Sequence, residues 1–145
     1  MKAFIFDIDG TLSLVGGRAK YLQQSPKDWD SFYNACDEDE PNIPIMVIYQ
    51  ALRRSLCTDY TIILLTGRRE STRAKTETWL RKYGIVPDIL LMRSDGDYRP
   101  DTELKPELLE PYDIAEAVVF EDRNSVVKMW REMGYICIQV APGDF

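Results

Sequence analysis

The sequence predicts an α/β protein with a Rossmann-like, mainly parallel sheet and helices on both faces. Two observations predict this: short apolar runs recur along the chain, and most of them are separated by segments with helical periodicity. Strands that alternate with helices in this way are parallel and buried on both faces. The expected strands are residues 3–6, 61–65, 89–92, 117–120 and 136–140.

The first apolar run leads directly into two carboxylates. Asp7 and Asp9 are one residue apart, and alternation along an extended chain points both side chains the same way. Gly10 then allows a sharp turn and a close approach of the backbone to a ligand. Two carboxylates so close repel each other, so we expect a divalent cation or a raised pKa there. An acidic turn after a strand is the alternative interpretation.

Residues 13–42 interrupt the alternation of strands and helices. They are rich in Gly, Gln, Asp and Pro, and we expect Trp29, Phe32 and Tyr33 on one short helix. We interpret the segment as a small cap inserted over the site of an otherwise single domain, residues 1–145, because 145 residues are too few for two ordinary domains. The three aromatic side chains are also candidates for stacking on bases.

The later helices are expected between the remaining strands. Pro106 and Pro111 are expected to bracket a short helix around Leu108, with Lys105 at its start. The longer helices are expected at residues 43–56, 70–83 and 125–133, the last two stopped by Gly84 and Gly134.

Polar residues gather where the expected strands end. The second strand ends in Thr66-Gly67-Arg68, the fourth ends in Glu121-Asp122-Arg123, and Lys105 falls between them in the sequence. Ligands of open α/β sheets bind at the carboxyl ends of the strands, so we expect these groups to share one crevice with the first carboxylate pair. Each has a structural explanation of its own, such as a helix cap or a surface lysine. Together they are typical of a magnesium-dependent phosphoryl-transfer site.

Composition narrows the chemistry. The chain has no histidine, which excludes Ser-His-Asp and Cys-His catalysis and most histidine-ligated metal sites. Its three cysteines lack the spacing of a zinc site or a disulfide framework. A net charge of −6 argues against stable binding of duplex nucleic acid, but not against recognition of one terminal phosphate by local arginines. We expect no membrane contact and a cytoplasmic location, because no bilayer-length apolar stretch or signal peptide is visible.

The strand-end motifs resemble those of a known superfamily. Asp7-Ile8-Asp9-Gly10-Thr11, Thr66, Lys105 and Glu121-Asp122 are similar, in order and spacing, to the four motifs of the haloacid dehalogenase (HAD) phosphatases. Residues 99–105 and 121–145 further resemble the 3′-phosphatase domain of bacteriophage polynucleotide kinase-phosphatases. Those enzymes have two aspartates where this chain has Glu121-Asp122. The chain lacks a G-x-x-x-x-G-K-[ST] loop, so the resemblance implies a stand-alone phosphatase module, with a phage origin and a host cytoplasm as one setting.

The resemblance implies catalysis through an aspartyl-phosphate. Asp7 would be the nucleophile, Asp9 the general acid and then the general base, and Thr66 and Lys105 would stabilise the phosphoryl oxygens. An oxygen-only ligand set suits Mg²⁺. The expected metal residues are Asp7, Asp9 through its carbonyl, Asp122, and Glu121 through a water. The expected substrate-binding residues are Arg18, Gly67, Arg68, Asp101, which would orient Lys105 or an arginine, and Arg123.

The expected function is therefore a Mg²⁺-dependent phosphomonoesterase that removes a 3′-phosphate from DNA or RNA ends or from nucleoside 3′-monophosphates. A separate kinase or ligase is an expected partner. The alternative within enzymes is a general or small-metabolite HAD phosphatase, such as a 5′-nucleotidase. A small cap favours the polymer end, because it leaves the site open. Two further alternatives are a protein that senses a phosphate end without turnover and a purely structural domain.

Overall fold

The computed structural model describes residues 1–55 and 59–145. Its centre is a five-stranded sheet with the strand order β5-β4-β1-β6-β7, and every neighbouring pair is parallel. The predicted α/β class is confirmed, and all five predicted strands form. They are β1 (Lys2–Phe6), β4 (Tyr60–Arg69), β5 (Ile89–Arg93), β6 (Glu116–Glu121) and β7 (Ile136–Gln139).

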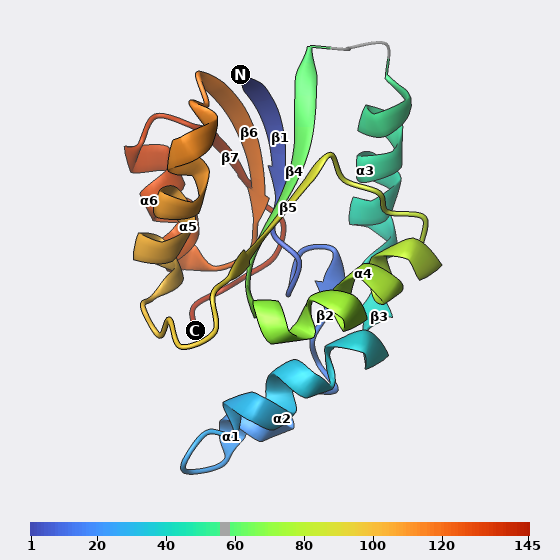
Figure 1. Cartoon of the computed structure of the whole chain (residues 1–145), viewed down its shortest axis with the longest axis vertical. Helices are drawn as coiled ribbons and strands as arrows, with labels where there is room; N and C mark the ends of the chain where they lie inside the picture. The colour runs from blue at the N-terminus through green and yellow to red at the C-terminus, as the bar shows by residue number, and fades with distance from the viewer. Residues whose placement is uncertain (56–58) are drawn as a thin grey trace.

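Helices cover both faces of the sheet (Figure 1). α3 (Ile43–Arg54) and α4 (Arg73–Lys82) lie on one face, and α5 (Asp101–Leu109) and α6 (Asn124–Glu132) lie on the other. Two 3-10 turns, η2 (Glu70–Thr72) and η3 (Glu110–Tyr112), precede α4 and follow α5. The helix predicted at residues 43–56 corresponds to α3. Its predicted last residue, Leu56, lies outside the described residues, as does Cys57.

Alternation along the strands produces two cores. Ile5 packs in one core with Trp130 of α6, whereas the next residue, Phe6, packs in the other with Tyr49 of α3 and Trp79 of α4. A central strand that buries both faces must be apolar throughout, which is why the strands read as continuous apolar runs. After Lys2 and Glu116, with which they begin, β1 and β6 are apolar until the carboxylates at their ends.

The prediction for the helix around Leu108 was wrong in its bounds. α5 begins at Asp101, four residues before Lys105, and Pro106 lies inside it instead of bounding it. Pro100 has an extended backbone, so the helix begins after it. The acidic residues of the first turn then interact favourably with the positive end of the helix dipole. Lys105 consequently sits mid-helix and is buried, facing the sheet.

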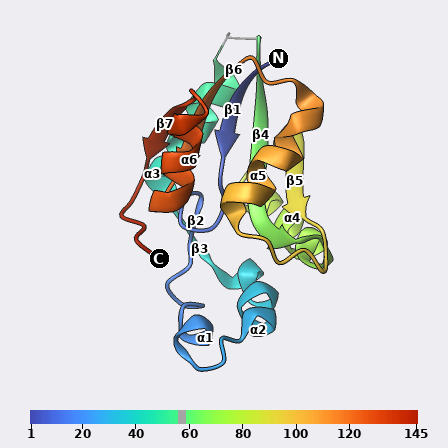
Figure 2. The ribbon, with the colours of Figure 1, turned by 90° about the vertical axis from the view of Figure 1, so that its left-hand side faces the viewer.

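Residues 13–42 form a small layer of their own beyond the carboxyl ends of the strands (Figure 2). The layer begins and ends with a short antiparallel pair, β2 (Ser13–Leu14) and β3 (Glu40–Pro41). Between them lie α1 (Lys20–Gln23), α2 (Trp29–Asn34) and the 3-10 turn η1 (Cys36–Glu38). α2 carries Trp29, Phe32 and Tyr33, whose rings pack on one another. None of the helices in the described ranges has the length and apolar content to span a bilayer.

Candidate active site

Three carboxylates meet at the tips of two neighbouring strands. Asp7 follows β1, Glu121 ends β6, and Asp122 comes next. The two strands are paired in register, Phe6 beside Phe120, so their ends coincide. One carboxylate oxygen from each of the three residues lies within 4.8 Å of the others, and all three residues are buried. This is an oxygen-rich cluster of the kind that hard divalent cations prefer.

Lys105 is the cation closest to this cluster. Its Nζ donates to Asp7 Oδ1 at 2.9 Å and to Glu121 Oε2 at 2.7 Å, and the residue is only 1% exposed. Burial opposes its charge, but Asp7 and Glu121 outweigh burial and raise the pKa of the ammonium. Lys105 is therefore a fixed positive charge in direct contact with Oδ1 of Asp7.

One ammonium does not neutralise three carboxylates. Burial and the neighbouring charge of Glu121 raise the pKa of Asp7 well above its usual value. Burial and the Glu121 side chain likewise raise the pKa of Asp122 to about 7. Burial also opposes the charge of Glu121, but Lys105 prevails and lowers the pKa of that carboxyl. The cluster carries unbalanced negative charge, so its residues fit a divalent cation, which would be held by Asp7 and Asp122 with Glu121 beside them.

Glycines let the backbone come close to these carboxylates. A Cβ on Gly10 would lie 2.1 Å from Asp122 Oδ2, and a Cβ on Gly143 would lie 2.1 Å from the Asp122 carbonyl oxygen. Gly10 also has a φ of +87°, which favours glycine. On the opposite side, a Cβ on Gly67 would lie 2.7 Å from Asp101 Oδ1. A side chain at Gly10 or Gly67 would displace a carboxylate of the site, and one at Gly143 would clash with the backbone of Asp122.

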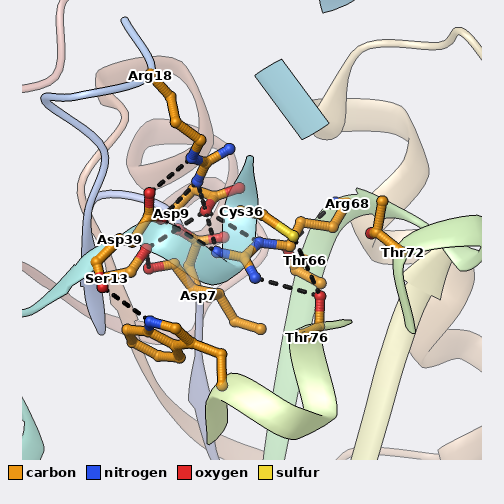
Figure 3. A network of polar contacts seen from close by, with 12 residues as sticks. Asp7, Asp9, Ser13, Arg18, Cys36, Asp39, Thr66, Arg68, Thr72 and Thr76 are labelled. Atoms are coloured by element: carbon orange, nitrogen blue, oxygen red, sulfur yellow. Dashed lines mark hydrogen bonds and ion pairs between the residues drawn. The ribbon is translucent and has the colours of Figure 1, made fainter. Parts of the chain in front are cut away.

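Asp9 belongs to a second ionic network, which it forms with two arginines (Figure 3). Its Oδ1 accepts from Arg18 Nη2 at 2.6 Å and from Arg68 Nη2 at 2.7 Å. Both arginines are almost completely buried. Burial disfavours the charge of Asp9, but Arg68 and Arg18 overcome it and hold the pKa of Asp9 well below its usual range. In this arrangement Asp9 is ionised, whereas Asp7 has a raised pKa.

Sequence reasoning missed the other carboxylate of this network, Asp39. It accepts from Arg18 Nε at 2.7 Å and Nη2 at 2.6 Å, and from Arg68 Nη2 at 3.3 Å. Its side chain is 2% exposed, and Trp79 Nε1 donates to its backbone carbonyl at 2.8 Å. Two arginines thus face two carboxylates, so the buried charges balance. Asp39 stands in an acidic run, residues 37–40, in which nothing marks one carboxylate as buried.

The expected substrate-binding residues fall into two groups. Arg18 and Arg68 form the first group, and their guanidinium groups donate hydrogen bonds to Asp9 and Asp39. Gly67, Asp101 and Arg123 instead line a cavity of about 600 Å³, whose lining includes the three clustered carboxylates. The cavity extends from Asp7, Asp9, Thr66 and Asp122 to the aromatic side chains of α2 and to Phe145.

Asp101 is held by a further arginine that sequence reasoning missed. Arg93 ends β5, is buried, and donates from Nη2 to Asp101 Oδ1 at 2.5 Å and from Nε to the Gly67 carbonyl at 2.9 Å. The other Asp101 oxygen lies 3.9 Å from Lys105 Nζ and 4.0 Å from Arg123 Nη1. Asp101 therefore lies between Lys105 of the cluster and Arg123 of the cavity wall.

A parallel sheet with a buried aspartate-lysine-acidic triad at its carboxyl edge, and a small helical layer above it, defines a phosphatase of the HAD type. The sequence model of one family, the polynucleotide kinase PNKP phosphatase domain, matches residues 1–145. The chain belongs to this family, and the predicted relationship and enzyme class are confirmed.

Solved structures are similar over almost the whole chain. A chain of the Pnkp1/Rnl/Hen1 complex shares 40% identity with a TM-score of 0.82, covering 99% of this chain and 47% of that one. A chain of the Pnkp1/Rnl/Hen1 RNA repair complex shares 38% identity with a TM-score of 0.83, covering 99% and 43%. The haloacid dehalogenase-like hydrolase SP0104 from Streptococcus pneumoniae, 14% identical with a TM-score of 0.64 over 94% and 83%, shares the fold.

A curated viral protein is also similar. A protein of Autographa californica nuclear polyhedrosis virus, assigned as a bifunctional polynucleotide kinase/RNA ligase, is 29% identical over 136 residues. The match covers 91% of this chain but 18% of the viral protein. The chain thus spans less than half the length of the larger proteins that it resembles.

Proposed function

We propose that this phosphatase domain removes the 3′-phosphate from RNA ends in a Mg²⁺-dependent reaction that passes through an aspartyl-phosphate. The observation that carries the proposal is the placement of Asp7 at the floor of the cavity. Its Oδ1 contacts Lys105 Nζ, and its carboxyl group adjoins the Glu121-Asp122 pair. A carboxylate that is fixed beside a cation and an acidic metal-binding pair is suited to attack phosphorus.

In the first step, Asp7 forms a bond to phosphorus while the bond from phosphorus to the nucleoside 3′-oxygen breaks. Mg²⁺, held by Asp7 and Asp122, would offset the repulsion between the carboxylates and the phosphate dianion. Lys105 supplies a second positive charge where negative charge develops, and the Thr66 hydroxyl lies on the cavity wall as a donor to a phosphoryl oxygen. The leaving oxygen takes its proton from Asp9.

In the second step, a water molecule attacks the phosphorus of the aspartyl-phosphate, Asp9 takes its proton, and the Asp7 carboxylate is released. The ionised Asp9 of this structure is in the form required for this step. The first step requires Asp9 to be protonated, which an incoming phosphate dianion favours by offsetting Arg18 and Arg68. We therefore assign those two arginines to positioning Asp9, and we place Gly67, Asp101 and Arg123 next to the substrate.

The chemistry of RNA repair supports the choice of the 3′ end. The similar proteins include a component of an RNA repair complex and a polynucleotide kinase/RNA ligase. A polynucleotide kinase adds a phosphate to a 5′ end, and a ligase then joins that end to a free 3′-hydroxyl. A phosphatase that serves both partners must leave the 5′-phosphate intact and remove the 3′-phosphate. We accordingly propose a kinase and a ligase as partners of this domain.

Phosphate release from matched oligoribonucleotides, one with a 3′-phosphate and one with a 5′-phosphate, tests this function. Both are incubated with Mg²⁺ and with EDTA, and Asp7→Asn is the control because it keeps the side-chain shape and removes the nucleophile. Preferential release from the 3′ end that needs Mg²⁺ and vanishes in the variant is expected. Equal release from both ends, or turnover of small esters alone, contradicts the proposal.

A further inference from the structure

A second hollow adjoins the active-site cavity. Its volume is about 330 Å³, and it shares Trp29, Tyr33, Asp101 and Arg123 with the larger cavity. Beyond these residues it is lined by the 93–100 segment and by Arg69 of β4. The two hollows therefore lie side by side, and together their lining runs from the carboxylates of the cluster, past the aromatic side chains of α2, to the loop after β5.

Tyr98 lines the second hollow with its ring held in solvent. It is 81% exposed, the largest exposure among the large apolar and aromatic residues of the described chain. The loop around it is braced on both sides: Arg93 Nη1 donates to the carbonyl oxygens of Asp97 at 3.1 Å and Arg99 at 2.7 Å. Arg99 Nη2 also pairs with Asp97 Oδ2 at 2.8 Å. A rigid loop thus presents an aromatic ring that fills no core.

Arg69 lies between this ring and the cap. Its guanidinium carbon is 5.8 Å from the centre of the Tyr98 ring and 5.1 Å from that of Tyr33. Its ionic partner is Asp30, at 2.6 Å, and the Asp30 side chain is 81% exposed. An ion pair of this kind is weak and easily exchanged for another anion. Arg99, in contrast, is fully engaged by Asp97 and Glu107 and serves to brace the loop.

We propose that this hollow binds the single strand immediately upstream of the terminal nucleotide. The base stacks on Tyr98, and the phosphodiester replaces Asp30 as the partner of Arg69. Alternating aromatic rings and cations are what a single strand recognises, because every base has a stacking face and every linkage carries one negative charge. A nucleoside monophosphate would fill the larger cavity alone. The inference rests on the proposed function and deepens it, because it assigns Tyr98 and Arg69 to holding the strand next to the terminal nucleotide.

The discriminating measurement compares substrates of different length. Steady-state kinetics are measured on a 3′-phosphorylated pentaribonucleotide and on a nucleoside 3′-monophosphate, with wild type, Tyr98→Ala and Tyr98→Phe. Val86→Ala, at an exposed apolar position outside both hollows, is the control. Loss of one base–aromatic stack is expected to raise the KM for the pentanucleotide at least about fivefold in Tyr98→Ala. Its kcat changes little, Tyr98→Phe retains the wild-type KM, and Val86→Ala matches wild type on both substrates.

Binding of the product provides a readout that does not depend on turnover. A fluorescent pentaribonucleotide with a 3′-hydroxyl is expected to bind wild type and Tyr98→Phe more tightly than Tyr98→Ala by the same factor. Equal binding by all three proteins, or equal KM values for the short and long substrates in wild type, overturns the inference while 3′-phosphate release still stands. Tight, Tyr98-dependent binding without any phosphate release would support the strand-binding hollow and remove the proposed reaction.

Discussion

Neutralising one carboxylate of the cluster tests two effects separately: the repulsion that this carboxylate adds to the folded protein, and its contribution to metal binding. In Asp122→Asn, one of three clustered carboxylates becomes neutral while Lys105 and the other two remain. At a separation of 4.8 Å and an effective dielectric of about 20, two like charges repel by about 3 kcal/mol. Because the pKa of Asp122 is about 7, its charge is mostly present at pH 8, and the measurement belongs there.

We expect Asp122→Asn to stabilise the metal-free protein at pH 8 by about 1–3 kcal/mol, since rearranged hydrogen bonds consume part of the relief. For a chain of this size, about 1 kcal/mol corresponds to about 4 °C in Tm. Mg²⁺ at about 100 times its Kd would stabilise wild type by about 2.7 kcal/mol and would stabilise the variant far less. The variant should thus begin with the higher Tm in EDTA and lose that advantage in Mg²⁺.

Differential scanning calorimetry of both proteins, with EDTA and with Mg²⁺, measures the crossing of the two stabilities. Glu132→Gln is the matched control, because it removes a carboxylate from a side chain that is 66% exposed on α6. Glu132→Gln should behave as wild type in both buffers. A lower Tm of Asp122→Asn in EDTA would contradict the repulsion within the cluster, and an undiminished Mg²⁺ shift would contradict the metal site.

Three other outcomes are expected. Asp39→Asn leaves two buried guanidinium groups facing one carboxylate, so urea unfolding should show a loss of about 3 kcal/mol, and a loss below about 1 kcal/mol would contradict the charge balance. Gly67→Ala forces Asp101 aside and should lower kcat at least about tenfold, whereas Gly17→Ala, where nothing lies within 4 Å, should keep wild-type activity. The pKa of Asp9 is lower in the folded protein than in the unfolded chain, where it is about 4, so the charge of Asp9 stabilises the fold at pH values above about 4. In urea unfolding, the difference in stability between wild type and Asp9→Asn should therefore narrow as the pH falls below about 4.

The sequence could predict the sheet and the acidic residues of the first ionic cluster because the signal for each strand and its end is local in the chain, although the contacts of the cluster are not. An apolar run that stops at a charge specifies the buried strand and the position of its tip, and parallel pairing brings neighbouring tips together. The contacts of Asp39 follow no such local pattern. They join residues 21 and 29 positions apart, and they form because residues 13–42 pack at the carboxyl ends of the strands. Arg93 was missed for a different reason: its partner Asp101 is only eight positions away, but an arginine at the end of a strand is ordinarily solvated.

The bounds of α5 show where local rules fail. Proline inside a helix removes one backbone donor, and this argument led to a predicted boundary at Pro106. In the structure, the buried Leu104, Lys105 and Leu109 hold the helix through that position. The contact of Lys105 with Asp7 and Glu121 depends on its place within the helix. Tertiary contacts therefore decided a boundary that the propensity of a single residue predicted wrongly.

The end of β4 has a consequence for how the chain tolerates insertions and deletions. Arg68 and Arg69 are consecutive, yet Arg68 turns in to Asp9 and Arg69 turns out to Tyr98. One residue gained or lost between Thr66 and Arg69 would exchange these directions. Arg68 would then point away from the buried network, and Arg69 would point into it. In a library of single-residue deletions, this stretch should be intolerant throughout, although it lies at the end of a strand, where length variation is ordinarily harmless.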